Sequence, residues 1–144
     1  MAYRTIITDT SAIYALVDSQ DAHHREAAKF WTSLEPGTVL LIAETTLMEA
    51  MTLIEVRLGH SIACRALEAI RKSERYRVVN LTTEDRQEMW RIFEQFSDKE
   101  WSPFDCASLA IAKRREIKEA FAFDLHFDQM AAMGLLRVPP KAAK

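Results

Sequence analysis

Near the start of the chain, a run of apolar and β-branched residues is followed directly by an acidic one: Arg4-Thr5-Ile6-Ile7-Thr8-Asp9-Thr10-Ser11. Residues 4–8 form a short run rich in β-branched side chains, which is typical of a buried strand. Similar patterns predict further strands at 38–42, 76–79, 119–123 and 135–138.

Helical patterns separate these strands. They cover 11–17, 22–34, 46–58, 61–73, 82–96 and 102–115, and a short helix follows 123. Strands that alternate with helices predict βαβ units, and hence an α/β fold in which helices cover a mainly parallel sheet. The helix at 46–58 is apolar nearly all round, so we expect it to be buried on several sides.

Composition limits the class of protein. The chain has 144 residues, of which 49% are hydrophobic and 28% charged, as expected of one globular domain. We place this domain at 1–138 and a short C-terminal tail at 139–144. The longest apolar runs, such as the one at 39–43, are no more than six residues long, whereas a membrane helix needs about 20. No secretory signal is visible, and the two cysteines form no disulfide or CxxC pattern, so we expect a cytoplasmic protein without a membrane partner.

The balance of charges bears on nucleic-acid binding. Lys and Arg number 19 against 21 Asp and Glu, a net charge of −2. This balance argues against a strongly basic nucleic-acid binder, but it allows a protein that makes a few phosphate contacts or uses a metal for them.

Four acidic residues follow or flank the predicted strands. Asp9 comes directly after the first strand, and Asp124 directly after the fourth. Glu49 and Asp105 lie in the first turns of two predicted helices. Open α/β sheets bind ligands outside the carboxyl ends of their strands. We therefore expect these residues, called the four acids below, to share one cleft.

Helix capping explains each acid separately. Thr46 and Glu49 have the spacing of a capping box, and Ser102 and Asp105 have the same spacing with Pro at the first helical position. The two acids that directly follow strands suit N-cap positions. Taken one at a time, the structural and functional interpretations are about equally supported.

A divalent cation explains the four acids together. Glu49 lies in an apolar helix with no Lys or Arg three or four residues away. A charge in such a helix needs a partner, and four carboxylates in one cleft repel one another without a cation. Oxygen-only ligands suit Mg²⁺ or Mn²⁺, which also bind phosphate. The chemistry that fits is metal-assisted hydrolysis of a phosphodiester.

Two other enzyme classes place an Asp after the first strand, and single residues exclude both. An aspartyl-phosphate phosphatase needs a second Asp two residues further on, where this chain has Ser11. A receiver domain needs a phosphorylatable Asp after the third strand, where the sequence runs Val79-Asn80-Leu81-Thr82.

Four segments together resemble the PIN-domain ribonucleases of the VapC toxin type. In order, they are Ile7–Leu16 (ITDTSAIYAL), the acid Glu49, Ser102–Ala110 (SPFDCASLA) and Ala122–Phe127 (AFDLHF). The likeness extends from residue 6 to about residue 136. Each segment is weak evidence alone, but their order and separations are specific. The chain departs from the family at Ala122, where relatives often have a threonine.

The resemblance implies a three-layer α/β/α fold with a central, mainly parallel sheet. It implies that the four acids hold Mg²⁺ or Mn²⁺ and that the protein cleaves RNA internally. Ser11 is implied as a supporting polar group, and Asp128 as an outer supporting acid. His126 stands close to Asp124, and we interpret its ring as packed at a helix start rather than as a phosphate contact.

The resemblance also implies protein partners. Such toxins are usually encoded with a small antitoxin that blocks the cleft, and they usually form homodimers. Two alternatives stay open: a stand-alone PIN nuclease in RNA processing, and a non-catalytic protein-binding module that keeps the acids as helix caps. A small neighbouring reading frame would favour the toxin over the first alternative. Stabilisation by a divalent metal would argue against the second.

Overall fold

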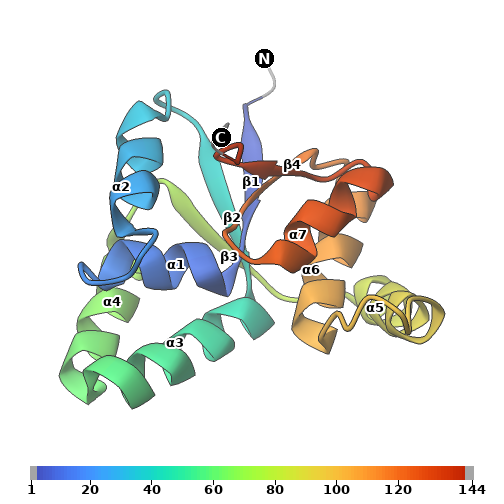
Figure 1. Ribbon diagram of the computed structural model, residues 1–144, viewed down its shortest axis with the longest axis horizontal. Helices are drawn as coiled ribbons and strands as arrows, with labels where there is room; N and C mark the ends of the chain where they lie inside the picture. The colour runs from blue at the N-terminus through green and yellow to red at the C-terminus, as the bar shows by residue number, and fades with distance from the viewer. Residues whose placement is uncertain (1–2, 142–144) are drawn as a thin grey trace.

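The computed structural model describes residues 3–141 and contains a five-stranded parallel sheet (Figure 1). Its strands are β1 (Thr5–Thr8), β2 (Val39–Ala43), β3 (Tyr76–Val79), β4 (Glu119–Phe121) and β5 (Leu136–Val138). They lie side by side in the order β3-β2-β1-β4-β5. The predicted parallel sheet is confirmed. The chain order reverses beside β1, so the carboxyl ends of β1 and β4 form the switch point at which such sheets bind ligands.

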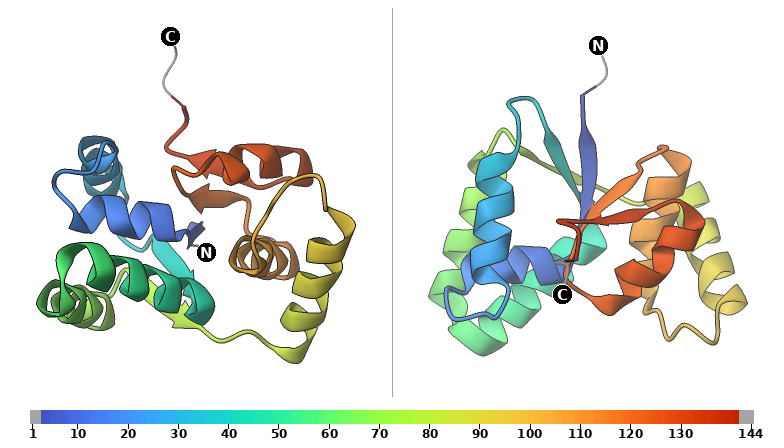
Figure 2. Two further views of the ribbon diagram at one scale, coloured as in Figure 1. Left: turned by 60° about the horizontal axis from the view of Figure 1, so that its bottom comes forward. Right: turned by 45° about the horizontal axis from the view of Figure 1, so that its top comes forward.

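Helices cover both faces of the sheet and its carboxyl edge (Figures 1 and 2). One face packs against α1 (Thr10–Val17), α2 (His24–Ser33) and α4 (His60–Lys72), and the other against α5 (Thr83–Gln95) and α6 (Pro103–Arg114). The helix α3 (Glu44–Leu58) crosses below the carboxyl ends of the strands, while α7 (Leu125–Gln129) and the 3₁₀ turn η1 (Met130–Met133) lead into β5.

The core follows from the alternation of side chains along each strand. Ile6 packs with α1 and α2, whereas the next residue, Ile7, packs with α5 and α6. In β2, Leu40 and Leu41 divide between the same two clusters. Strands covered on both faces need apolar side chains at successive positions, which is the pattern that the sequence shows. The three-layer α/β/α architecture is thereby confirmed.

The start of α3 differs from the prediction. The helix begins at Glu44, with Ala43 as its N-cap and no side-chain hydrogen bond at that end. Glu49 therefore lies in the second turn rather than the first. The predicted Thr46–Glu49 capping box is wrong, because Thr46 is the third residue of the helix rather than its N-cap.

The burial predicted for α3 is also wrong. Only Thr46, Ala50 and Ile54 of this helix are buried, while Met48 is 55% exposed and Val56 78% exposed. The reason is its place in the fold. The helix crosses the edge of the sheet, so one face meets the core and the other stays uncovered (Figure 1).

The end of the chain agrees with the prediction of a last short strand. β5 pairs with β4 in parallel through Val138 and Phe121. Residues 139–141 follow without a helix or strand, and the rest of the predicted tail, 142–144, lies outside the described residues. No helix within residues 3–141 has the length and apolar character needed to cross a membrane.

The capping box of α5 yields a prediction about stability. Thr82 Oγ1 accepts a hydrogen bond from the Asp85 amide at 3.0 Å, and Asp85 Oδ2 accepts one from the Thr82 amide at 2.9 Å. Thr82→Ala should therefore lower the free energy of unfolding by about 1 kcal/mol. Chemical denaturation measures the change, and Thr83→Ala, at the next exposed position, is the control. Equal stability of the two variants would contradict the assignment.

Candidate active site

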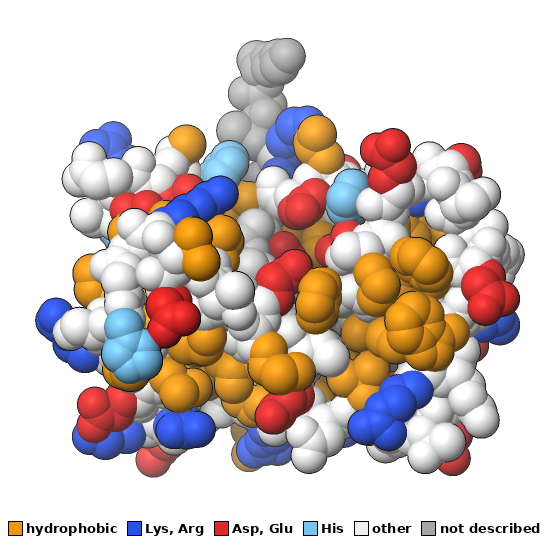
Figure 3. All heavy atoms as spheres, turned by 90° about the horizontal axis from the view of Figure 1, so that it is seen from below, with side chains coloured by type: hydrophobic (Ala, Val, Ile, Leu, Met, Phe, Trp, Pro, Cys, Tyr) orange, Lys and Arg blue, Asp and Glu red, His pale blue; other side chains and the backbone are white. Residues whose placement is uncertain are grey.

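A cleft of about 770 Å³ lies at the carboxyl ends of β1 and β4, where the order of the strands reverses. Seen from below, the molecule shows acidic side chains on this face with hydrophobic ones gathered around them (Figure 3). Residues from α1, α3, α6 and the β4–α7 region line the cleft: Asp9, Thr10, Ser11, Met48, Glu49, Thr52, Leu53, Val56, Ser102, Phe104, Asp105, Asp124 and His126. The cleft thus includes all four acids.

Asp9 lies where β1 ends and α1 begins. Its amide donates to the Phe121 carbonyl at 2.9 Å, which ties it to the end of β4. Its side chain is the N-cap of α1, as predicted. Oδ2 accepts from the Ser11 amide at 3.0 Å and from Ser11 Oγ at 2.5 Å. Ser11 Oγ in turn accepts from the Phe123 amide at 2.9 Å, so Ser11 fixes Asp9 relative to the segment that carries Asp124.

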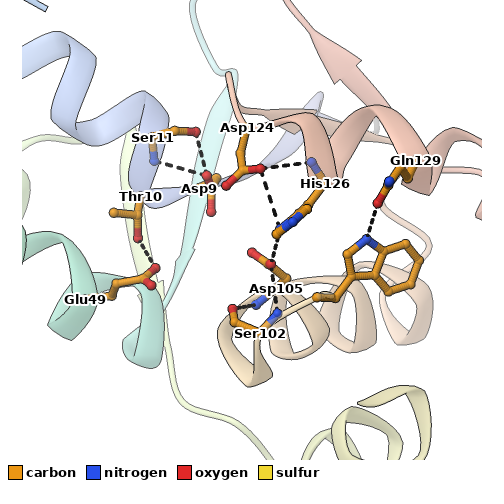
Figure 4. A network of polar contacts seen from close by, with 10 residues as sticks. Asp9, Thr10, Ser11, Glu49, Ser102, Asp105, Asp124, His126 and Gln129 are labelled. Carbon is orange, nitrogen blue, oxygen red and sulfur yellow. Dashed lines mark hydrogen bonds and ion pairs between the residues drawn. The ribbon is translucent and has the colours of Figure 1, made fainter. Parts of the chain in front are cut away.

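Glu49 reaches the cleft from α3. Its Oε1 accepts a hydrogen bond from Thr10 Oγ1 at 2.5 Å (Figure 4). The contact joins the second turn of α3 to the first residue of α1. Glu49 thus has a hydroxyl partner from another element rather than the capping contact suggested by its spacing from Thr46.

The ring of His126 lies between Asp105 and Asp124 in the cleft (Figure 4). The predicted capping box of α6 is confirmed: Asp105 Oδ2 accepts from the Ser102 amide at 3.0 Å. The Asp124 side chain caps α7, with Oδ1 accepting from the His126 amide at 2.9 Å. Both acids therefore serve as helix caps and also line the cleft.

His126 is the functional candidate that sequence reasoning underrated. Its Nδ1 lies 2.8 Å from Asp105 Oδ2 and 3.6 Å from Asp124 Oδ1. Burial lowers the pKa of this imidazole, but the hydrogen bond with Asp105 and the charges of both carboxylates outweigh it and raise the pKa overall. The Asp-x-His spacing was the available signal. The contact with Asp105, 21 residues away in the chain, appears only in the fold.

Asp128 is not brought together with the four acids. It does not line the cleft, and its Oδ1 lies 3.0 Å from Arg137 Nε in β5. Arg137 in turn lies over the Phe123 ring. The geometry assigns Asp128 to the packing of α7 against β5.

Negatively charged groups outnumber positively charged ones among the described residues of the cleft. Burial raises the pKa of Asp9 to about 7, the two hydrogen bonds from Ser11 oppose the shift, and the charges of Asp105 and Asp124 add to it. Burial likewise raises the pKa of Glu49, the Thr10 hydroxyl opposes it, and the same two acids add to it. None of the described residues that line the cleft is Lys or Arg. A cation would relieve this repulsion.

The hydrogen bonds of the four acids leave room for further ligands. Within residues 3–141, the contacts of each acid fall on one oxygen: Oδ2 of Asp9, Oε1 of Glu49, Oδ2 of Asp105 and Oδ1 of Asp124. The second oxygen of each carboxylate remains for another partner. No three His, Cys, Asp or Glu side chains in this part of the chain are already gathered as a metal site. The donors fit a hard cation in kind, and the acids share a cleft without forming a closed cage.

Comparison with known proteins gives concordant results. The PIN domain family model matches residues 6–133. The chain is 34% identical over 136 residues to the "23S rRNA-specific endonuclease VapC20" of Mycobacterium tuberculosis, which spans 94% of this chain and 99% of that protein. The crystal structure of M. tuberculosis VapC20, described as a "Sarcin-Ricin loop cleaving toxin", matches with a TM-score of 0.79 at 32% identity, over 90% of this chain and 95% of that one.

More distant structures share the fold. FitAcB from Neisseria gonorrhoeae matches with a TM-score of 0.67 at 16% identity, over 91% of this chain and 96% of that one. VapBC2 from Rickettsia felis, bound to a DNA fragment from its promoter, matches with a TM-score of 0.66 at 8% identity, over 92% and 98% of the two chains.

The raised pKa of Asp9 predicts how the stability of the metal-free protein depends on pH. The pKa of about 7 in the folded protein lies above the ordinary value of 3.8 for an aspartic acid. The contribution of Asp9 to the free energy of unfolding is therefore fully present below about pH 4. It is lost as the pH rises toward about 7. Asp9→Asn removes the charge but keeps an oxygen for Ser11, so this variant should be more stable than the wild type at about pH 8.

Thermal unfolding between about pH 4 and pH 8, with chelator present, measures this effect. Asp98→Asn removes a carboxylate that is 73% exposed and should follow the wild type. An Asp9→Asn variant that is less stable than the wild type at the alkaline end would show that the buried charge is already compensated.

Proposed function

Because the chain belongs to the PIN domain family, we propose that it is a metal-dependent endoribonuclease of the VapC type, which hydrolyses phosphodiester bonds in RNA. The observation that carries the proposal is the convergence of Asp9, Glu49, Asp105 and Asp124, from four separate helices or their caps, on one cleft without Lys or Arg among its described lining residues. The relative at 34% identity is named as an endonuclease specific for 23S rRNA, which supports RNA as the substrate class.

We propose Mg²⁺, with Mn²⁺ as a substitute, as the cofactor. The second oxygens of the four acids supply a set of hard, anionic ligands, and such ions bind carboxylates together with substrate phosphate. A divalent cation held there would polarise the scissile phosphate and make water a stronger nucleophile. Zinc is favoured by histidine and cysteine ligands, whereas the described residues that line the cleft include no cysteine, and His126 Nδ1 already contacts Asp105.

The chain's own residues keep the carboxylates in place. Ser11 directs Asp9 through two hydrogen bonds, and Thr10 directs Glu49 through one. The Ser102 amide and His126 Nδ1 both contact Oδ2 of Asp105, so the orientation of this carboxylate is set from two elements. Trp101 Nε1 also donates to Gln129 Oε1 at 2.9 Å, which joins the approach to α6 to the end of α7. The acids are thus preorganised before substrate arrives.

A toxin of this type needs a protein that restrains it. We propose a cognate antitoxin that covers the cleft, a homodimer as the assembled form, and a cytoplasmic location where RNA is accessible. The described toxin activity of the relative at 32% identity supports this role. A small protein encoded next to this chain should copurify with it and abolish RNA cleavage. A stand-alone nuclease would have no such neighbour.

Cleavage of purified total RNA tests the nuclease proposal. The wild type with Mg²⁺ or Mn²⁺ should cleave, and EDTA should abolish cleavage. Asp9→Asn, Glu49→Gln, Asp105→Asn and Asp124→Asn should each reduce the rate by about 100-fold or more, because each removes a charge from the cation site.

The control for this experiment is Asp98→Asn, which removes an exposed carboxylate outside the cleft and should cleave like the wild type. Full activity of two or more of the four variants, or cleavage that persists in EDTA, would contradict the metal-dependent mechanism.

A further inference from the structure

The cleft has two chemically different parts. One part holds the four acids and His126, and the other is apolar, with Met48, Leu53 and Val56 from α3 and Phe104 from α6. Phe104 directly precedes Asp105 in the first turn of α6, yet 38% of this large side chain is exposed. Hydrophobic side chains visibly adjoin the acidic ones on this face (Figure 3).

The absence of Lys and Arg from the described cleft lining restricts how RNA is held there. Proteins usually position nucleic acids by contacts from basic side chains to phosphates. In this cleft the acids repel every phosphate except one that shares a cation with them. His126, the other lining residue that can carry a positive charge, already contacts Asp105. Contacts to the sugar or the base are therefore the main remaining source of affinity near the reacting bond. A base has apolar faces that stack on aromatic side chains, whatever its sequence.

The position of Phe104 suits such a contact. The residue lies between Pro103, which begins α6, and the cap Asp105, so the first turn of α6 fixes its backbone. A substrate phosphate near Asp105 brings the attached nucleotide within reach of the adjacent side chain. Unlike the buried Phe121 and Phe127, Phe104 is partly exposed and lines the cleft beside the acids.

We propose that Phe104 is the platform on which the base of a nucleotide adjoining the scissile phosphate stacks, with the apolar side chains of α3 lining the rest of the base site. This inference rests on the proposed nuclease function and adds a substrate-positioning residue to it. A base inside a duplex is covered on both faces by its neighbours. The nucleotide at Phe104 is therefore unstacked, and this chain selects sites where a base can turn out of the helix.

Steady-state kinetics on a short RNA that contains one mapped cleavage site test the proposal. Phe104→Ala should raise KM about 10-fold with kcat changed less than 3-fold, because stacking holds substrate and transition state alike. Phe104→Trp should restore KM. Phe93→Ala is the matched control, since Phe93 is 42% exposed on α5 but does not line the cleft.

A second measurement uses the RNA rather than the protein. An abasic nucleotide placed in turn on the 5′ and the 3′ side of the cleaved bond should raise the KM of the wild type by a similar factor at one of the two positions. With Phe104→Ala, the abasic nucleotide at that position should have no further effect, because the two changes remove the same contact.

The outcomes separate this inference from the function on which it rests. If the wild type cleaves no RNA in either metal, the nuclease proposal and this inference both fail. This inference alone is overturned if the wild type cleaves but Phe104→Ala leaves KM unchanged. The same holds if Phe104→Ala and the abasic nucleotide multiply each other's effects on KM. Thermal melting with and without Mn²⁺ shows that the variant is folded. If the Phe104→Ala variant is not folded, the abasic substrates still test the base site in the wild-type protein.

Discussion

The mutual repulsion of buried carboxylates is the constraint on which the rest of the site depends. Desolvation and neighbouring negative charges raise the pKa of Asp9 to about 7. Ionising all four acids without a cation is therefore energetically unfavourable. The surrounding structure holds the acids in spite of this cost. Hydroxyls from Ser11 and Thr10 and backbone amides supply donors, and the imidazole of His126, whose pKa these acids raise, contacts Asp105. A divalent cation would relieve the remaining repulsion.

Helix capping and ligand binding are compatible roles for the same carboxylates. Asp9, Asp105 and Asp124 each cap a helix with one oxygen. The cap orients the carboxylate rigidly, and the other oxygen is left to face the cleft. The switch point of the sheet then determines which caps meet, because β1 and β4 are adjacent and end at the same edge. The fold thus builds a cation site from ordinary features of helix starts.

Much of this arrangement was predictable from local sequence. The strand before Asp9 and the Ser102–Asp105 cap are set by neighbouring residues, and both predictions are confirmed. The start of α3 was not predictable, because its N-cap is Ala43, whose side chain gives no capping signal. The exposed face of α3 was also missed, since an apolar pattern records hydrophobicity but not whether a neighbour covers it.

Contacts between segments that are distant in the sequence also could not be predicted. The pairing of His126 with Asp105 and the ion pair of Asp128 with Arg137 depend on how α6, α7 and β5 pack. Neither is encoded in spacing along one element. The participation of the four acids in metal binding remains a prediction from their types and their shared cleft.

Proton release on metal binding tests the central claim most directly. At about pH 6 most Asp9 carboxyls are protonated, given a pKa of about 7, so a cation that binds there must displace a proton. Calorimetric titration with Mn²⁺ in buffers of different ionisation enthalpy measures this release. We predict about one proton released at pH 6, a value that falls toward zero above about pH 8 and that Asp9→Asn abolishes together with tight binding. No binding by the wild type, or binding with the same proton balance in Asp9→Asn, would contradict the account.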